Sequence, residues 1–261
     1  MYQITSSNNP IIKELKNLSK KKDRWIKKQY IIEGTKPVRE AIQEKTEIIN
    51  IFYSEKLFDR EEGKTLFNEL EHEKNIIKLE DKLFQSISNM ENSQGIFAVA
   101  KFKNLSFEDM KSREVYIYLD EIQDPGNMGT IIRSSDAFHM GGIIIGKGCV
   151  DPFNPKVVRA SMGSIFRVNL IFEEKANETF EKLKQSGRRI LVTSLENSND
   201  INQFSFYNND IIVIGNEGKG VKKEILEIAN SLIKIPMRGL AESLNAGIAA
   251  SIVMYEISSR A

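Results

Sequence analysis

Short apolar runs alternate with helical segments from residue 114 to residue 258, and this order constrains the fold more than any other feature. The apolar runs read as buried strands: EVYIYLD, GGIIIG, FRVNLIF, RRILVTSL, DIIVIG and SLIKIP. Strands that alternate with helices at this spacing favour a mostly parallel sheet covered by helices on both faces. We therefore expect an α/β domain over residues 114–261.

The first part of the chain carries a second, smaller pattern of the same type. Between Tyr30 and Lys101 the strand-like runs are YIIEG, IINIFY, NIIKLE and GIFAVAK, with helical segments between them. Residues 102–113 are polar and follow neither the helical nor the strand period. This predicts a small N-terminal α/β domain over residues 1–101, a linker over 102–113 and the larger domain over 114–261.

Composition excludes several classes of protein. Apolar residues make up 41% and charged residues 28% of the 261, which is ordinary for a globular protein. The 37 Lys and Arg against 36 Asp and Glu exclude a uniformly basic protein that coats nucleic acid. One cysteine and two histidines leave no set of ligands for a structural zinc, so no metal is expected. No signal peptide or membrane-spanning run is present, and we expect a cytoplasmic protein without a membrane partner.

Basic residues gather near the N-terminus. Lys20, Lys21, Lys22 and Arg24 stand next to Trp25, so phosphate-attracting charge lies beside a ring on which a base could stack. The alternative is a lysine-rich helix end that only faces solvent. The position of this block, ahead of a small α/β unit, favours RNA binding.

Three glycine-bearing segments follow strands, where open α/β sheets place their ligands. The first is DPGNMGTIIR, in which Asn127 can cap a helix and Arg133 follows within two turns. Capping explains Asn127, and we interpret Asp124 as a surface turn residue. Packing gives no reason for an arginine at this place, so Arg133 is a candidate functional residue.

The second segment, IGNEGKG, has glycines at 215, 218 and 220. These match neither the dinucleotide fingerprint nor the P-loop, so nucleotide phosphates are not the expected ligand. A glycine-rich turn lets a ligand approach the backbone closely, and Glu217 adds a negative charge. The alternative is an ordinary turn with Glu217 and Lys219 on the surface.

The third segment, KIPMRGLAESLNAGI, joins a strand to a helix that is rich in small residues. Ser243 or Asn245 opens this helix, and either residue is often no more than a cap. The small side chains that follow suggest close helix packing, including packing between subunits.

Together these segments resemble the three motifs of the SpoU/TrmH branch of the SPOUT RNA methyltransferases. The stretch PKVVRASMG at Pro155–Gly163 also resembles that family. The N-terminal part is similar to the L30e-like RNA-binding domain that often precedes such a catalytic domain. The resemblance implies a homodimer with a trefoil knot that uses S-adenosylmethionine to methylate a ribose 2′-hydroxyl in RNA.

The resemblance also implies roles for single residues. Arg133 matches the catalytic arginine of the family, and the remaining expected site residues are listed by role. The other catalytic positions are Asn127, Glu217, Ser243 and Asn245; the methyl donor lies against Thr193, Gly215, Ile235 and Leu244; and RNA is bound by Lys20, Lys21, Lys22, Arg24, Trp25 and Arg159.

Large-subunit (23S) ribosomal RNA is the expected substrate, because an L30e-like domain suits folded rRNA. Three alternatives stay open at this point. The chain could methylate transfer RNA, or it could be a non-catalytic RNA-binding factor in ribosome assembly on the same scaffold. The third alternative, a small-molecule enzyme that uses a dinucleotide, lacks its glycine fingerprint.

Overall fold

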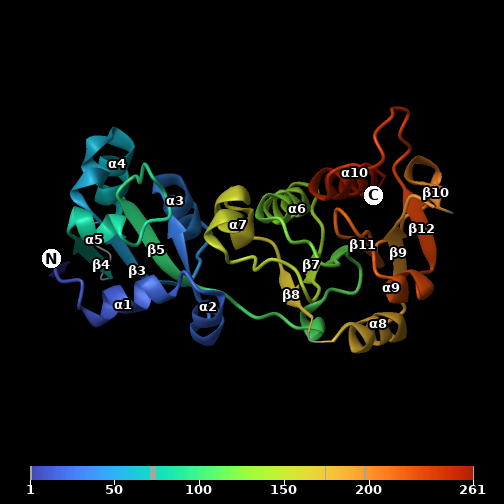
Figure 1. Ribbon diagram of the computed structural model, residues 1–261, viewed down its shortest axis with the longest axis horizontal. Coiled ribbons are helices and arrows are strands. Elements are labelled where there is room, and N and C mark those ends of the chain that lie inside the picture. The colour runs from blue at the N-terminus through green and yellow to red at the C-terminus, as the bar shows by residue number, and fades with distance from the viewer. Residues whose placement is uncertain (1, 71–74, 174, 197, 261) are drawn as a thin grey trace. The chain divides into compact units, whose positions relative to one another are not determined.

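The computed structural model describes residues 2–70, 75–173, 175–196 and 198–260, and the chain divides into two compact units (Figure 1). Unit 1 consists of Met1–Lys103 and Phe153–Phe166. Unit 2 consists of Asn104–Pro152 and Arg167–Ala261. Both units are α/β structures, as the alternation of strands and helices predicted.

Unit 1 is built on a five-stranded mixed sheet with the order β1-β4-β3-β5-β2. Strand β5 runs antiparallel to β2 and β3, and the other pairs are parallel. The strands are β1 (Tyr2–Ile4), β2 (Gln29–Glu33), β3 (Ile48–Tyr53), β4 (Ile76–Leu79) and β5 (Ile96–Lys101). The helices are α1 (Pro10–Asn17), α2 (Lys21–Lys27), α3 (Thr35–Gln43), η1 (Glu55–Asp59), α4 (Glu61–Leu70), α5 (Asp81–Gln85), α7 (Pro155–Ala160) and η3 (Ser164–Phe166).

Aromatic rings form the centre of the unit 1 core. The ring of Phe97 on β5 lies 5.0 Å from that of Phe52 and 4.9 Å from that of Phe84, measured between centroids. Helix α1 adds Ile12 and Leu15, which lie on its one apolar face and are buried. Burial of these large side chains is the main source of stability for a unit of this size.

The segment Phe153–Phe166 belongs to unit 1, although the sequence placed it inside the 114–261 domain. Phe153 stacks on Phe102 with a centroid distance of 3.9 Å and packs against Tyr30 at 5.0 Å. Helix α7 follows directly and packs against β2. An aromatic contact between distant parts of the chain therefore draws this segment into unit 1, and no period in the sequence reports such a contact.

Unit 2 is built on a seven-stranded sheet in which every pair is parallel, with the order β10-β12-β9-β11-β6-β7-β8. The strands are β6 (Tyr116–Leu119), β7 (Gly142–Ile145), β8 (Leu170–Phe172), β9 (Arg189–Thr193), β10 (Asn199–Asp200), β11 (Asp210–Ile214) and β12 (Ser231–Lys234). The helices are η2 (Phe107–Asp109), α6 (Pro125–Ala137), α8 (Ala176–Gln185), η4 (Ile201–Gln203), α9 (Lys223–Glu227) and α10 (Ala246–Ser258).

Helices cover both faces of this sheet, which explains why its central strands β6 and β11 are buried at every position (Figure 1). Phe180 and Leu183 of α8 and Ile225 of α9 pack on one face. Helices α6 and α10 pack against each other on the other side of the sheet (Figure 1). Within the described ranges, no helix has the length and apolar character needed to cross a lipid bilayer. The trefoil knot implied by the resemblance stays a prediction.

The polar stretch after β5 is ordered against unit 2 from Asn104 onward. Leu105, Phe107 and Met110 pack against the core of unit 2 and are partly buried. Arg188 donates a hydrogen bond of 3.0 Å to the carbonyl of Glu114, where the stretch enters β6. The segment predicted as a linker therefore has its own packing, carried by single apolar residues too widely spaced to form a periodic pattern.

Candidate active site

One buried side-chain amide joins the three glycine-bearing segments. Asn127, which is 7% exposed, accepts a hydrogen bond of 2.8 Å at Oδ1 from Nδ2 of Asn245. Its own Nδ2 donates to the carboxylate of Glu217. Because both ends of the amide are engaged, Asn127 has one favoured orientation. The structure thus brings together three of the five predicted catalytic residues.

Asn127 is available for this role because another residue caps the helix. The Asp124 carboxylate accepts a hydrogen bond of 2.8 Å from the backbone N–H of Asn127, and Pro125 follows as the first helical residue. The expectation that Asn127 caps α6 is therefore wrong, and so is the interpretation of Asp124 as a mere turn residue. A cap at Asp124 satisfies the free N–H of the first turn and leaves the Asn127 side chain to face Glu217.

The loop that carries Glu217 is tightly closed. The side chain of Asn216 accepts hydrogen bonds from the N–H groups of Gly218 at 2.9 Å and Lys219 at 3.1 Å. A Cβ atom at Gly215 would lie 2.5 Å from the backbone nitrogen of Val221. Glycine is required at position 215 because the two ends of the loop approach each other there.

Asn245 caps α10 and also reaches α6. Its Oδ1 accepts a hydrogen bond of 3.2 Å from the backbone N–H of Ile248, while its Nδ2 binds Asn127. A Cβ at Gly247 would lie 3.3 Å from the Asn127 Cα, and the hydroxyls of Ser134 and Ser251 are 2.7 Å apart. The small residues of α10 therefore allow close packing against α6 within this chain.

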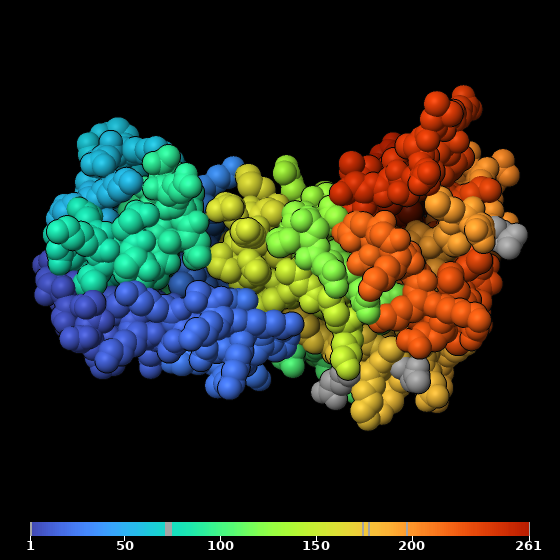
Figure 2. All heavy atoms as spheres, in the orientation of Figure 1, coloured from blue at the N-terminus to red at the C-terminus, as the bar shows by residue number. Residues whose placement is uncertain are grey.

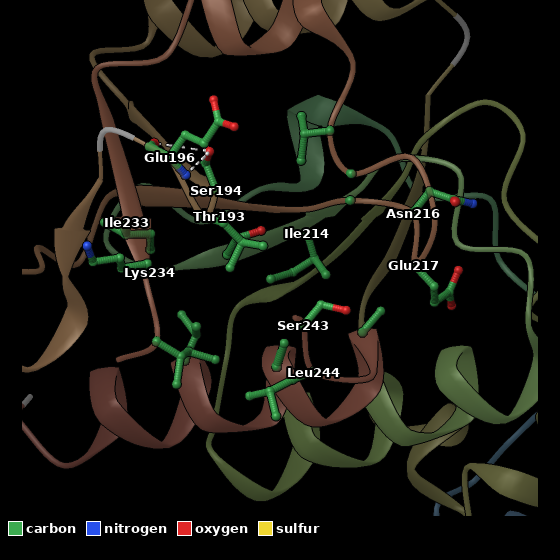
Figure 3. Close-up of a pocket in the computed structure, with 18 of the residues that line it drawn as sticks. Thr193, Ser194, Glu196, Ile214, Asn216, Glu217, Ile233, Lys234, Ser243 and Leu244 are labelled. Atoms are coloured by element: carbon green, nitrogen blue, oxygen red, sulfur yellow. Dashed lines mark hydrogen bonds between the residues drawn. The ribbon is translucent and has the colours of Figure 1, made fainter. Parts of the chain in front are cut away.

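A cavity of about 520 Å³ lies beside this network (Figure 3). All four residues predicted to hold the methyl donor line it: Thr193, Gly215, Ile235 and Leu244. Glu217 and Ser243 line it as well, so the cavity reaches the motif residues. Its volume is typical of small-molecule sites, and apolar side chains such as Ile214 and Val253 form part of the wall.

The walls combine apolar side chains with polar ones such as Ser194, Glu196 and Lys234. The Thr193 hydroxyl donates a hydrogen bond of 2.9 Å to the carbonyl of Val213 inside the sheet. The segment between β12 and α10 projects from unit 2 (Figure 2) and contributes Ser243 and Leu244 to the cavity. Gly215, with no side chain, leaves its peptide groups open to a ligand. This combination fits a ligand with a flat apolar part and several hydrogen-bonding atoms, such as a nucleoside.

Arg133 lies apart from the hydrogen-bond network. Helical geometry turns its side chain about 120° around α6 from that of Asn127. It is exposed, makes no hydrogen bond or ion pair with any residue of the described ranges, and is not among the residues that line the cavity. Its guanidinium is therefore free to meet a phosphate or a hydroxyl that comes from outside the cavity.

Known protein families account for this arrangement. Residues 114–255 match the SpoU rRNA Methylase family, and residues 9–98 match the MRM3-like substrate binding domain. The chain belongs to the SpoU rRNA methylase family. The predicted family, the methyltransferase class and the use of S-adenosylmethionine are confirmed.

Relatives of the SpoU family cover almost the whole chain. The 23S rRNA (guanosine(2553)-2'-O)-methyltransferase RlmP of Bacillus subtilis (strain 168) is 29% identical over 257 residues, which is 98% of this chain and 99% of that protein. A crystal structure of an AdoMet-bound rRNA methyltransferase from Sinorhizobium meliloti has a TM-score of 0.86 at 28% identity and covers 99% of this chain and 97% of its own. The SpoU methyltransferase AviRb from Streptomyces viridochromogenes, at 23% identity and a TM-score of 0.83, has the same fold over 97% of both chains.

Two residues predicted to bind RNA have structural roles in this SpoU protein. Arg24 is 3% exposed and donates hydrogen bonds of 2.8 Å to the carbonyls of Leu18 and Ser19, just after α1. The prediction that Arg24 binds RNA is wrong, because its buried guanidinium donates to carbonyl groups that the end of α1 leaves unpaired. Trp25 is partly buried, with its ring 5.4 Å from that of Phe102, so it is packed in unit 1.

The other predicted RNA-binding residues are exposed. Lys20, Lys21 and Lys22 lie at the start of α2, and Arg159 lies on α7. None of the four side chains forms a hydrogen bond or an ion pair with a residue that the structure describes. Because α7 belongs to unit 1, all four basic side chains are carried by the same unit.

The single cysteine takes no part in the site. Cys149 is 8% exposed and its thiol donates to the carbonyl of Leu119 at 3.3 Å. Burial raises the pKa of this thiol to about 12, so it stays protonated and unreactive at neutral pH. Across the described residues, no group of three or more His, Cys, Asp or Glu side chains is arranged to hold a metal ion.

Sequence reasoning missed two charged residues beside the cavity loop. Asp120 is 2% exposed and binds Lys222 at the far end of the loop that carries Glu217. An acidic residue that directly follows a buried strand was a usable signal for Asp120. The sequence offered no signal for Lys222, since it is one of many lysines in helical surroundings.

The substitution Asn127→Asp tests the network. It removes the donor to Glu217 and sets two carboxylates against each other, which raises the pKa of one of them. We expect methyl transfer to fall about 100-fold at pH 8. As the pH is lowered to 6, one of the two carboxyl groups takes up a proton and can donate a hydrogen bond to the other. The activity of the variant relative to wild type should therefore rise.

The measurement is the ratio of variant to wild-type rates between pH 6 and pH 8. Asn208→Asp, at an exposed position of the same unit, makes the same chemical change away from the network and should keep a constant ratio near one. A constant ratio for Asn127→Asp as well would contradict a role in catalysis for the bond between Asn127 and Glu217.

Proposed function

We propose that this protein transfers a methyl group from S-adenosylmethionine to a ribose 2′-hydroxyl of 23S ribosomal RNA. The observation that carries the proposal is the Asn127–Glu217–Asn245 network beside a cavity lined by all four predicted donor-binding residues. The name of the Bacillus subtilis relative supports the substrate and the atom methylated, and the AdoMet-bound relative supports the donor.

Positioning supplies most of the catalysis in this proposal. S-adenosylmethionine brings a methyl group on a positive sulfur, which reacts by in-line displacement without metal or acid assistance. Gly215, Ile235 and Leu244 hold the donor, and Glu217 with Ser243 borders the end where RNA enters. Holding two reactants in line lowers the barrier by as much as about 7–11 kcal/mol in favourable systems.

The 2′-hydroxyl must also lose its proton. A guanidinium acting as the base would have to lower its pKa by about 5 units, at a cost of about 7 kcal/mol. We propose that Arg133 stays positively charged and stabilises the developing alkoxide or grips the adjacent phosphate. The proton then passes to a phosphate oxygen or to water.

The proposal is tested by methyl transfer with labelled donor to unmodified 23S rRNA, 16S rRNA and bulk tRNA in separate reactions. We expect label in 23S rRNA only, released on digestion as a 2′-O-methyl nucleoside. Arg133→Ala should lower the rate about 100- to 1,000-fold, and Arg133→Lys should retain part of the activity because a charge remains.

Other results of these methyl-transfer experiments would favour the alternative functions or contradict the role of Arg133. Label in tRNA would favour the tRNA alternative, and label on a base would refute ribose methylation. Donor binding without transfer to any pool would indicate a substrate absent from the three pools, such as an assembly intermediate, and absence of donor binding would favour the assembly-factor alternative. Equal rates for Arg133→Lys and Arg133→Ala would contradict a role that depends on charge alone.

We propose that unit 1 binds the RNA and that unit 2 carries out the transfer. The match to a substrate binding domain and the exposed lysines of α2 support this division. Trp25 is packed inside unit 1, so the contact with RNA rests on charge, from Lys20, Lys21, Lys22 and Arg159. RNA substrates of this kind are recognised through phosphates and shape more than through duplex sequence.

The double substitution Lys21→Gln/Lys22→Gln tests this surface. If both lysines contact phosphates, RNA affinity should fall, and the slope of log affinity against log salt should become shallower by about 0.7–0.9 per lysine. Lys82→Gln, at an exposed position on α5 of the same unit, serves as the control and should leave both quantities unchanged. An unchanged salt slope in the double variant would place the RNA elsewhere.

We also propose a homodimer, located in the cytoplasm where ribosomal RNA is the substrate. Ile248 is 52% exposed and Tyr255 is 58% exposed, seven residues apart on one face of α10. Exposed apolar residues in such a row are typical of a surface that packs against a second copy. Arg133 is carried by α6, the helix against which α10 packs.

Light scattering should therefore give a mass of twice 29.8 kDa. Tyr255→Glu places a charge on the proposed surface and should shift the protein to monomers, because a buried unpaired charge is costly. Tyr2→Glu, at a residue that is 56% exposed in unit 1, should leave the dimer intact. A monomeric wild-type protein would overturn the proposal.

A further inference from the structure

The loop that lines the cavity is tied at both ends to the two residues that follow β6. We propose that Asp120, Glu121 and Lys222 are positioning residues that hold this loop, residues 215–221, in the shape that receives the methyl donor. The inference rests on the proposed function and assigns a role to three residues outside the motif positions.

At the far end, one carboxylate holds Lys222 twice. Oδ2 of Asp120 accepts a hydrogen bond of 2.8 Å from the backbone N–H of Lys222, and Oδ1 lies 3.1 Å from its Nζ. Nζ also lies 3.0 Å from Oε1 of Glu121. Hydrogen bonding to Lys222 holds the pKa of the Glu121 carboxyl below its usual value. Asp120 is 2% exposed, so its charge needs this partner.

At the near end, the same segment holds Asn216. Its Nδ2 donates a hydrogen bond of 2.9 Å to the backbone carbonyl of Glu121. Glu121 has a φ of 55°, a left-handed conformation that is uncommon outside glycine and that the contacts around it maintain. Residues 120 and 121 therefore anchor both Asn216 and Lys222.

Every residue from Gly215 to Val221 lines the cavity, so the shape of this loop is the shape of one wall. The loop holds three glycines, which leave its backbone free to adopt many conformations unless other contacts restrain it. Restraint before binding reduces the entropy that the ligand would otherwise have to overcome. The ion pairs of Lys222 supply that restraint and lie outside the cavity lining.

The same anchor serves the catalytic side. Asp120 and Glu121 lead into Asp124, which caps α6 and thereby places Asn127 against Glu217 of the anchored loop. Hydrogen bonds thus join the two segments at Asp120 with Lys222, at Glu121 with Asn216, and at Asn127 with Glu217. Loss of the first contact should loosen the wall for the donor before it affects RNA, which is bound by a different unit in the proposed function.

The test compares substitutions of two neighbouring lysines. Lys222→Met removes both ion pairs but keeps the length of the side chain, and we expect the Kd for S-adenosylmethionine, measured by calorimetry, to rise at least tenfold. The KM for the donor should rise by the same factor, while the KM for RNA should stay within twofold. Lys223→Met is the matched control, because Lys223 does not line the cavity, is 90% exposed and has only a 3.8 Å contact with Glu227 of its own helix; its donor Kd should stay within twofold of wild type.

A milder variant keeps the test decisive if Lys222→Met does not fold by circular dichroism. Glu121→Gln removes one of the two ion pairs at a side chain that is 26% exposed, and the donor Kd should rise about threefold. A donor Kd within 1.5-fold of wild type in that variant would overturn the inference, as would a Kd within twofold of wild type in folded Lys222→Met. A lower unfolding temperature with an unchanged donor Kd would show a purely structural role and would also overturn it. Failure of the wild-type protein to bind the donor would instead refute the proposed function.

Discussion

The structure of the site depends on the need of one buried amide for two partners. Asn127 is almost fully covered, and an amide in such a position loses stability unless both its donor and its acceptor are engaged. Its partners come from segments about ninety and one hundred and twenty residues further along the chain, the loop with Glu217 and the cap of α10. The parallel sheet makes this meeting possible, since β11 lies beside β6 and their carboxyl ends open at the same edge.

The sequence was a good guide wherever a local pattern carried the information. Apolar runs located six of the seven strands of unit 2, all but the short polar β10, and glycine-bearing turns located several of the residues that line the cavity, Gly215 among them. The burial of Arg24 could not be read in this way, because a lysine-rich segment looks the same whether one of its charges faces solvent or the end of a neighbouring helix. The helix cap was misassigned for a related reason: Asp124 and Asn127 are both good caps, and only the contact with Glu217 separates them.

Contacts between distant segments account for the remaining differences. The segment that carries α7 lies between strands of unit 2 in the sequence, yet Phe153 and its stacking partner Phe102 draw it into unit 1. The chain therefore crosses between the units after Lys103, after Pro152 and after Phe166.

The division of charge in the site follows from the reaction it serves. A donor that already carries a positive sulfur needs no strong acid or metal, so its cavity can be built from apolar walls and a glycine-bearing loop. In the proposed reaction the demanding charge arises on the RNA hydroxyl, and Arg133, an exposed arginine whose side chain has no partner among the described residues, is the group proposed to meet it. The Glu217 carboxylate, by contrast, has a neutral partner in the amide of Asn127. The amide that holds the three segments together therefore also keeps a carboxylate beside the cavity engaged while the cation stays free for the substrate.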